Sequence, residues 1–88
     1  MSRYTMINDP GQVYKLAEHL IQSARAHARE DLALRLNGAL NLGSSSLEIV
    51  GAIAAVLSQE VEALAKFAER ATIEAAIQYA QKMYGHPQ

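Results

Sequence analysis

Residues 41–48 read Asn-Leu-Gly-Ser-Ser-Ser-Leu-Glu, and this stretch decides how the chain folds. Gly43 suits the left-handed backbone position that follows the last turn of a helix, so we expect a helix to end just before it. Ser45 and Glu48 match the Ser-x-x-Glu capping box, which satisfies free backbone N–H groups at a helix start. The stretch therefore predicts the end of one helix and the start of another near the middle of the 88-residue chain.

The segment before this turn has helical periodicity from Asp9 onward. Asp9 can cap the free N–H groups of a first turn, and Pro10 fits the first position of a helix. Apolar residues then recur at spacings of three and four as far as Leu40. Glu30-Asp31 is a possible second start, but the apolar stripe rotates through this region without a jump. The pattern leaves open whether residues 10–41 form one bent helix or two.

The segment after the turn, residues 46–84, also has a helical pattern. Beyond Ala71 its apolar stripe moves to a different face at Ile73, since each residue of a helix adds about 100° of rotation. We expect either a bend near Thr72, with Thr72 as a new cap, or one long helix that packs against two partners. The first part of the stripe consists of Val50, Ile53, Leu57, Val61, Leu64 and Phe67.

These patterns predict an all-α protein with one of two architectures. One is a small helical bundle of three to four helices, and the other is a long helical hairpin completed by dimerisation. The two prolines lie near the chain ends, which leaves the interval between them free to be helical. We expect a flexible N-terminal arm over residues 1–8, a single helical domain over residues 9–85 and a tail over residues 86–88.

Composition and charge exclude several classes of function. The formal net charge of −1 provides no long-range field that would attract nucleic acid or a membrane surface. The absence of cysteine favours a reducing cytoplasm over export, because small secreted domains usually need disulfides. The first nine residues contain no signal-like apolar run, and the longest apolar stretch is far shorter than the roughly 20 residues of a membrane span. We predict a cytoplasmic protein without membrane contact.

One helical face carries side chains of the kinds that bind metals or transfer protons. His19, Ser23, His27 and Asp31 follow one another at steps of four along a helical face. His19 and His27 are two turns apart, about 12 Å, so they cannot share one metal ion. We interpret the face as solvated, and predict no catalytic residue, no metal site and no cofactor. The protein is accordingly predicted not to be an enzyme.

Helix–turn–helix DNA binding is a lesser alternative suggested by the turn at Gly43. A recognition helix needs Arg, Lys, Asn or Gln side chains at its start to read bases and phosphates. Between Leu36 and Ala65 the chain has no basic residue. We therefore predict no nucleic-acid partner.

Gly43-Ser44-Ser45-Ser46-Leu47 resembles the attachment site of acyl carrier proteins, where a Gly-x-Asp-Ser-Leu sequence opens the second helix. The resemblance covers five residues and a rough four-helix layout. It implies that Ser46 would carry phosphopantetheine. The chain departs from the pattern at Ser45, where carriers have aspartate, and in an apolar rather than acidic helix after the motif. An acyl-carrier-like protein modified at Ser46 is the alternative function.

The amount of apolar surface points to the leading hypothesis. Residues 51–57 are apolar around the whole helix circumference, which predicts burial on all sides. A chain this short has few other helices that could pack around such a helix and cover it. We predict a non-enzymatic helical protein–protein interaction module that self-associates as a homodimer or a larger assembly. One other protein is a second possible partner. It would act as a small regulator, adaptor or inhibitor. The candidate interface residues are Val50, Ile53, Leu57, Val61, Leu64 and Phe67.

Overall fold

The computed structural model of the chain describes residues 6–42 and 45–84. In these residues the backbone forms helices and no strand, which confirms the all-α prediction. The predicted stop at Gly43 lies outside the described residues. The helices are α1 (Pro10–Ala26), α2 (Glu30–Leu40), α3 (Ser46–Gln59), α4 (Val61–Leu64) and α5 (Arg70–Tyr84).

The helix starts predicted at Asp9 and Ser45 are confirmed. The Asp9 carboxylate accepts a hydrogen bond from the Gln12 backbone N–H at 3.0 Å, and the Gln12 side chain accepts one from the Asp9 N–H at 3.2 Å. This reciprocal pair is a complete capping box for α1. At the start of α3, the Ser45 hydroxyl accepts from the Glu48 N–H at 3.3 Å. Each cap satisfies a backbone donor that the first turn would otherwise leave unpaired.

A tight turn separates α1 from α2, so the first half of the chain is two helices. Ala28 has a φ of 61°, in the left-handed region. Its N–H bonds to the Arg25 carbonyl at 3.1 Å, and the Arg29 N–H reaches back to the Ala24 carbonyl at 2.7 Å. This pair of bonds is the Schellman motif, which usually has glycine at the position that Ala28 occupies. Ala28 therefore adopts a backbone conformation that costs a non-glycine residue about 1 kcal/mol.

Replacing Ala28 with glycine is expected to stabilise the protein by about 1 kcal/mol, because glycine adopts positive φ without steric penalty. The midpoint of urea unfolding, followed by far-ultraviolet circular dichroism, measures the change. Ala26→Gly is the matched control: Ala26 is an exposed residue in the last turn of α1, where glycine should destabilise by about 0.5–1 kcal/mol. Equal destabilisation by both substitutions would contradict the left-handed turn.

The second half of the chain is interrupted earlier than the sequence predicted. The helix leaves regular geometry at Glu60, and residues 65–69 form a turn before α5 begins at Arg70. The predicted cap at Thr72 is therefore wrong, since Thr72 lies inside α5. The short α4 between these breaks turns the chain, which allows α5 to return across α3. This is the physical origin of the shift in the apolar stripe.

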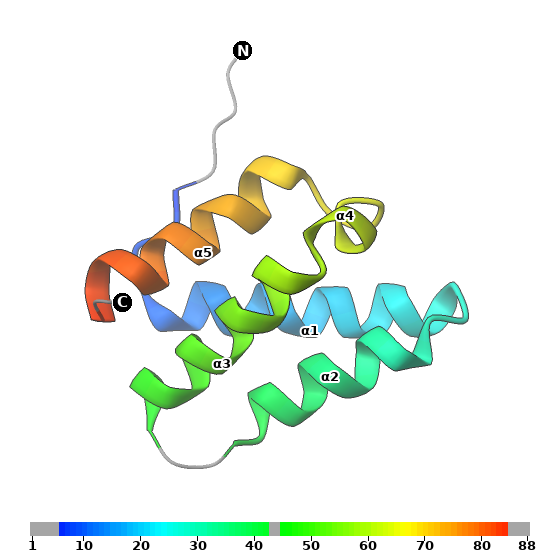
Figure 1. Cartoon of the computed structure of the whole chain (residues 1–88), viewed down its shortest axis with the longest axis horizontal. Coiled ribbons are helices and arrows are strands. Elements are labelled where there is room, and N and C mark those ends of the chain that lie inside the picture. The colour runs from blue at the N-terminus through cyan, green and yellow to red at the C-terminus, as the bar shows by residue number, and fades with distance from the viewer. Residues whose placement is uncertain (1–5, 43–44, 85–88) are drawn as a thin grey trace.

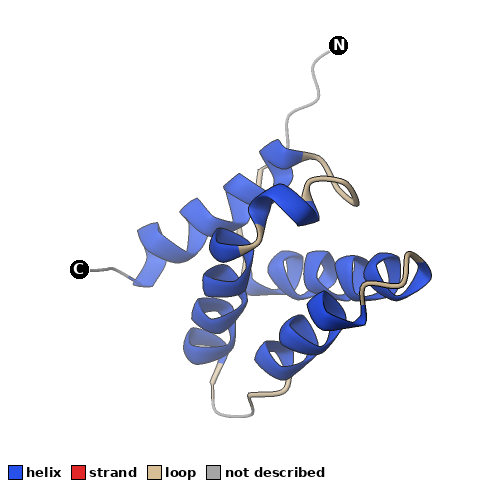
Figure 2. Ribbon diagram, turned by 45° about the vertical axis from the view of Figure 1, so that its right-hand side comes forward, coloured by secondary structure: helices blue, strands red, loops and turns tan. Residues whose placement is uncertain are grey.

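The helices pack as a bundle within one chain. Helices α1 and α2 lie side by side, α3 crosses them, and α5 packs across α3 on the side away from α2 (Figures 1 and 2). A single helix over residues 10–41 would be about 48 Å long, whereas the longest dimension of the molecule is 38 Å. The long-hairpin alternative is therefore excluded, and the bundle alternative is confirmed.

Helix α3 is the centre of the bundle, in contact with each of the other four described helices. Its inner side contributes Val50, Ile53 and Leu57, all fully buried. The expectation that residues 51–57 are buried on all sides is only partly right, because Gly51 and Ala55 are exposed. Four neighbours cover the large side chains and leave the smallest ones to solvent, where the free-energy penalty of exposure is least. Among the described residues the buried set contains no polar or charged side chain.

Candidate interaction surface

The structure places the sequence-predicted interface residues in or against the core of the single chain. Val50, Ile53, Leu57 and Leu64 have no solvent exposure. Val61 and Phe67 are half-buried and pack against the same core. Their apolar character is thus accounted for by contacts between helices of one chain. A surface that a partner could touch must be sought among other residues.

Three large apolar side chains are exposed on α2, on α3 and at their connection. The exposed fraction is 58% for Leu34, 49% for Leu42 and 50% for Leu47. Leu34 stands on the outer side of α2, and Leu47 lies in the first turn of α3. Exposed apolar side chains that gather into one patch are typical of interaction sites, whereas single ones are ordinary on any protein.

Two glycines lie on the same exposed sides of these helices. A Cβ built on Gly38 of α2 or on Gly51 of α3 would meet no atom within 4 Å. Gly38 follows Leu34 by one helical turn, and Gly51 follows Leu47 by one turn, so each glycine is a neighbour of an exposed leucine. Ala55 continues the α3 stripe by one further turn. We call the following residues the α2–α3 surface: Leu34, Gly38, Leu42, Leu47, Gly51 and Ala55.

From Gly38 onward the α2–α3 surface is almost free of charge, whereas Glu30 and Asp31 lie one helical turn before Leu34. Glu48 is the one ionisable residue between positions 36 and 59 of the sequence. At its edge, Arg35 of α2 forms an ion pair with Glu60 and donates to the Gln59 side chain, which ties α2 to the far end of α3. The inner sides of these helices pack in the core, so the outer apolar sides are what a partner can reach.

The remaining described ion pairs join residues other than the six of this surface, although Glu30 and Asp31 border it one turn before Leu34. Hydrogen bonds from Arg29 lower the pKa of the Asp31 carboxyl, and the Arg29–Asp31 contact is 2.9 Å. Arg70 lowers the pKa of Glu62 in the same way, with a contact of 3.0 Å. All four side chains are on the solvent side of the protein, where such pairs contribute little to stability. They mark the ordinary solvated surface, against which the α2–α3 surface stands out.

The predicted solvated face of α1 has a structural role that the sequence did not indicate. The His19 Nε2 atom hydrogen-bonds to the Phe67 backbone carbonyl at 3.1 Å. The ring of His27 packs against the ring of Phe67, with centroids 5.0 Å apart. Both histidines thereby fasten the turn between α4 and α5 to α1. Both contacts join residues far apart in the chain, so the spacing of residues along one helix could not predict them.

Ser46, the candidate modification residue, is the first residue of α3 and is exposed. The capping role belongs to its neighbour Ser45. Gly43 and Ser44 of the carrier-like motif lie outside the described residues. The exposed side of α3 presents Ser46, Glu48 and Gly51 and no basic side chain. Recognition of DNA bases by this helix is therefore not expected.

Within residues 6–42 and 45–84, no three His, Asp or Glu side chains are grouped so that they could hold a metal ion. None of the described helices combines the length and the apolar character needed to cross a lipid bilayer.

Comparisons with protein-family models, with curated proteins and with solved structures find no match to this chain. The geometry of the molecule is therefore the basis for assigning a function.

Proposed function

We propose that this protein is a helical protein–protein interaction module that self-associates through the α2–α3 surface. The observation that supports this most strongly is the exposure of Leu34 and Leu47 beside two open glycines, where Glu48 is the one ionisable residue between positions 36 and 59. Covering such side chains removes apolar area from water and is favourable. The protein would act without catalysis as a small regulator, adaptor or inhibitor. A chain without cysteine fits the reducing cytoplasm as its site of action.

A second copy of the chain is the partner that the charge pattern favours. In a two-fold symmetric dimer the same patch faces itself, so any concentration of like charge on it would be repulsive. The part of the α2–α3 surface between positions 36 and 59 limits this repulsion, because Glu48 is its one ionisable residue in the sequence. Gly38 and Gly51 add a steric argument, since a helix backbone can approach closely where no Cβ stands in the way. Close approach increases the number of dispersion contacts between the copies.

Leu34→Glu is expected to weaken self-association roughly tenfold or more, because dimerisation would then bury two unpaired carboxylates. Sedimentation equilibrium of both chains over about 1–100 µM, a range that covers weak dimers, measures the change. The fold should be unaffected, since Leu34 is 58% exposed in the single chain.

Met6→Glu is the matched control for this experiment. Met6 is also 58% exposed, and it precedes α1 and belongs to neither α2 nor α3. It should leave the dimerisation constant unchanged, and the helical content of both variants should match that of the wild type. A wild-type chain that stays monomeric throughout this range, or a Leu34→Glu chain that dimerises normally, would refute self-association through this surface.

Exposure of Ser46 at the start of α3 keeps the carrier function as a second candidate. Incubation with coenzyme A and a phosphopantetheinyl transferase, followed by intact mass measurement, separates the two. A mass gain of one phosphopantetheine that is lost in Ser46→Ala would favour the carrier. Under the interaction proposal the mass stays unchanged, and Ser46→Ala dimerises as the wild type does because Ser45 still caps α3.

A further inference from the structure

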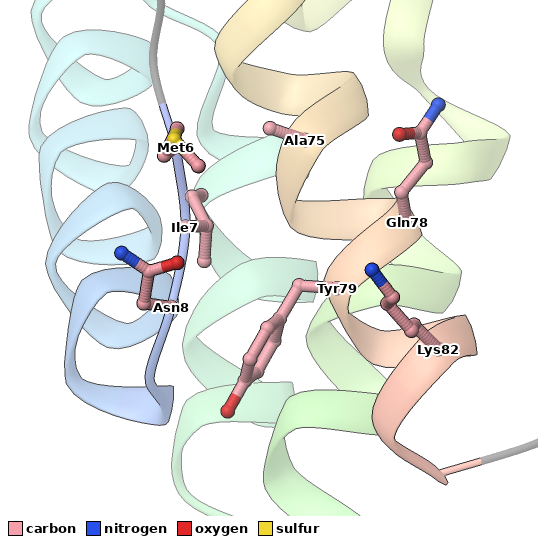
Figure 3. Close-up of a pocket in the computed structure, with 7 residues that line it drawn as sticks. All are labelled: Met6, Ile7, Asn8, Ala75, Gln78, Tyr79 and Lys82. Carbon is pink, nitrogen blue, oxygen red and sulfur yellow. The ribbon is translucent and has the colours of Figure 1, made fainter.

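A groove of about 250 Å³ lies between the N-terminal arm and α5. Figure 3 shows its two walls: Met6, Ile7 and Asn8 belong to the extended arm, and Ala75 and Tyr79 of α5 point toward it. Gln78 and Lys82 line the groove from farther round α5. The groove is separate from the α2–α3 surface and involves none of its residues. The arm has no regular secondary structure, and the groove is the space between it and α5.

The arm is held in place by the start of α1, so its separation from α5 is built into the fold. The Gln12 side chain accepts hydrogen bonds from the Asn8 and Asp9 backbone N–H groups, and its amide nitrogen donates to the Met6 carbonyl at 3.2 Å. Ile7 is half-buried and packs against the core. Three hydrogen bonds and one apolar contact thus fix residues 6–9 relative to the bundle. Preorganised walls lower the entropy cost of binding a ligand.

The lining combines an apolar part with one positive charge. Met6, Ile7 and Ala75 contribute apolar surface, and the buried Tyr79 ring forms part of the wall on α5. The Lys82 side chain extends back along α5 to the level of Tyr79 (Figure 3). None of the described carboxylates forms an ion pair with Lys82.

The polar lining selects the charge of the ligand. Apart from the phenol of Tyr79, Lys82 is the one ionisable group in the lining, and the other polar side chains are the amides of Asn8 and Gln78. An ammonium with amide neighbours favours an anion, and a flat carboxylate can accept from both kinds of donor. The volume is below the roughly 300–1,000 Å³ of typical small-molecule sites, which limits the ligand to a short chain.

We infer that this groove binds a small amphipathic carboxylate, with its apolar chain against Met6 and Ile7 and its carboxylate at Lys82. The inference is independent of the proposed self-association, since it uses different residues and a different partner.

The test titrates hexanoate into the isotopically labelled protein and follows backbone amide shifts by NMR. Hexanoate should shift the amides of residues 6–8 and 75–82, with a dissociation constant in the roughly millimolar range expected of so small a ligand. Hexylamine, which has the same chain and the opposite charge, should produce no saturable shift at these amides. Shifts of equal size with both probes, or hexanoate shifts elsewhere in the protein, would overturn the inference.

Two variants separate the charge from the cavity. Lys82→Gln should weaken hexanoate binding about threefold, as expected for an exposed ion pair, and Lys66→Gln on the exposed side of the α4–α5 turn should leave it unchanged. Ala75→Leu fills the groove and should abolish saturable binding. Ala71→Leu places the same side chain on an exposed position of α5 and should bind as the wild type does. If Ala75→Leu binds hexanoate normally while keeping wild-type helical content, the groove is not the site.

Discussion

Leu57→Asp is expected to leave the protein largely unfolded at room temperature. Leu57 has no solvent exposure and lies on the inner side of α3, the helix that contacts all the other described helices. The substitution loses the packing of a buried leucine and places a carboxylate where no described side chain can pair with it. The two effects together cost about 5 kcal/mol or more. A domain of this size has a total stability of about 5–10 kcal/mol. Circular dichroism at neutral pH should show most of the helical signal lost.

Ser58→Asp is the matched control, because Ser58 is the next residue of α3 and is exposed. It should retain the helical spectrum and unfold within about 0.5 kcal/mol of the wild type. The opposite outcome for Leu57→Asp is informative as well. A folded, helical monomer would mean that Leu57 is covered by a second copy rather than by its own chain, which would refute the bundle described above.

Leu64→Ala is expected to destabilise the protein by about 3 kcal/mol, with a proportional shift in the urea midpoint. Leu64 has no solvent exposure and is the one buried side chain of α4. A helix of four residues has no independent stability, so α4 depends on this anchor to turn the chain between α3 and α5. Removing the side chain leaves a cavity at the junction and loosens the connection on which the position of α5 depends.

Leu34→Ala makes the same chemical change at a leucine that is 58% exposed. Measured at a concentration where the chain is monomeric, it should change the free energy of unfolding by less than about 0.5 kcal/mol. Similar destabilisation by both substitutions would show that Leu34 is buried or that Leu64 is not, and either result would contradict the packing.

Helix starts could be predicted from the sequence because capping is local. Asp9 and Ser45 each bond to a backbone N–H three residues away, so the pattern within a few residues contains the whole interaction. Helix ends were harder to predict from the sequence. The turn after α1 has Ala28 rather than glycine at its left-handed position, so the usual stop signal is missing. The turn at residues 65–69 contains neither glycine nor proline.

What holds that second turn is distant in the sequence. His19 of α1, 48 residues earlier in the chain, hydrogen-bonds to the Phe67 carbonyl. His27, which caps the end of α1 and lies 40 residues earlier, packs its ring against that of Phe67. The same histidines were interpreted as a solvated face, since a helical pattern reports which side of its own helix is polar. It does not report which other segment uses that side.

The candidate surface shows the same limit. The sequence predicted Val50, Ile53 and Leu57 as interface residues, and the structure buries them in one chain. A periodic apolar stripe marks the side of a helix that must be covered, but it is the same pattern for a core and for an interface. A signal for the exposed surface was present in Leu34, which is about 160° away from Leu36 around the helix and so falls off the buried stripe.

By itself, therefore, the sequence determined that this chain is helical, where the helices capped by Asp9 and Ser45 begin and which sides of them need burial. Those properties follow from backbone donors and side-chain periodicity within a few residues of each position. Only the tertiary structure decided that the first half is two helices, that α3 is covered by its own chain, and that Leu34, Leu42 and Leu47 are left exposed. Each of these depends on which helix packs against which, and that choice is made by contacts between residues far apart in the chain.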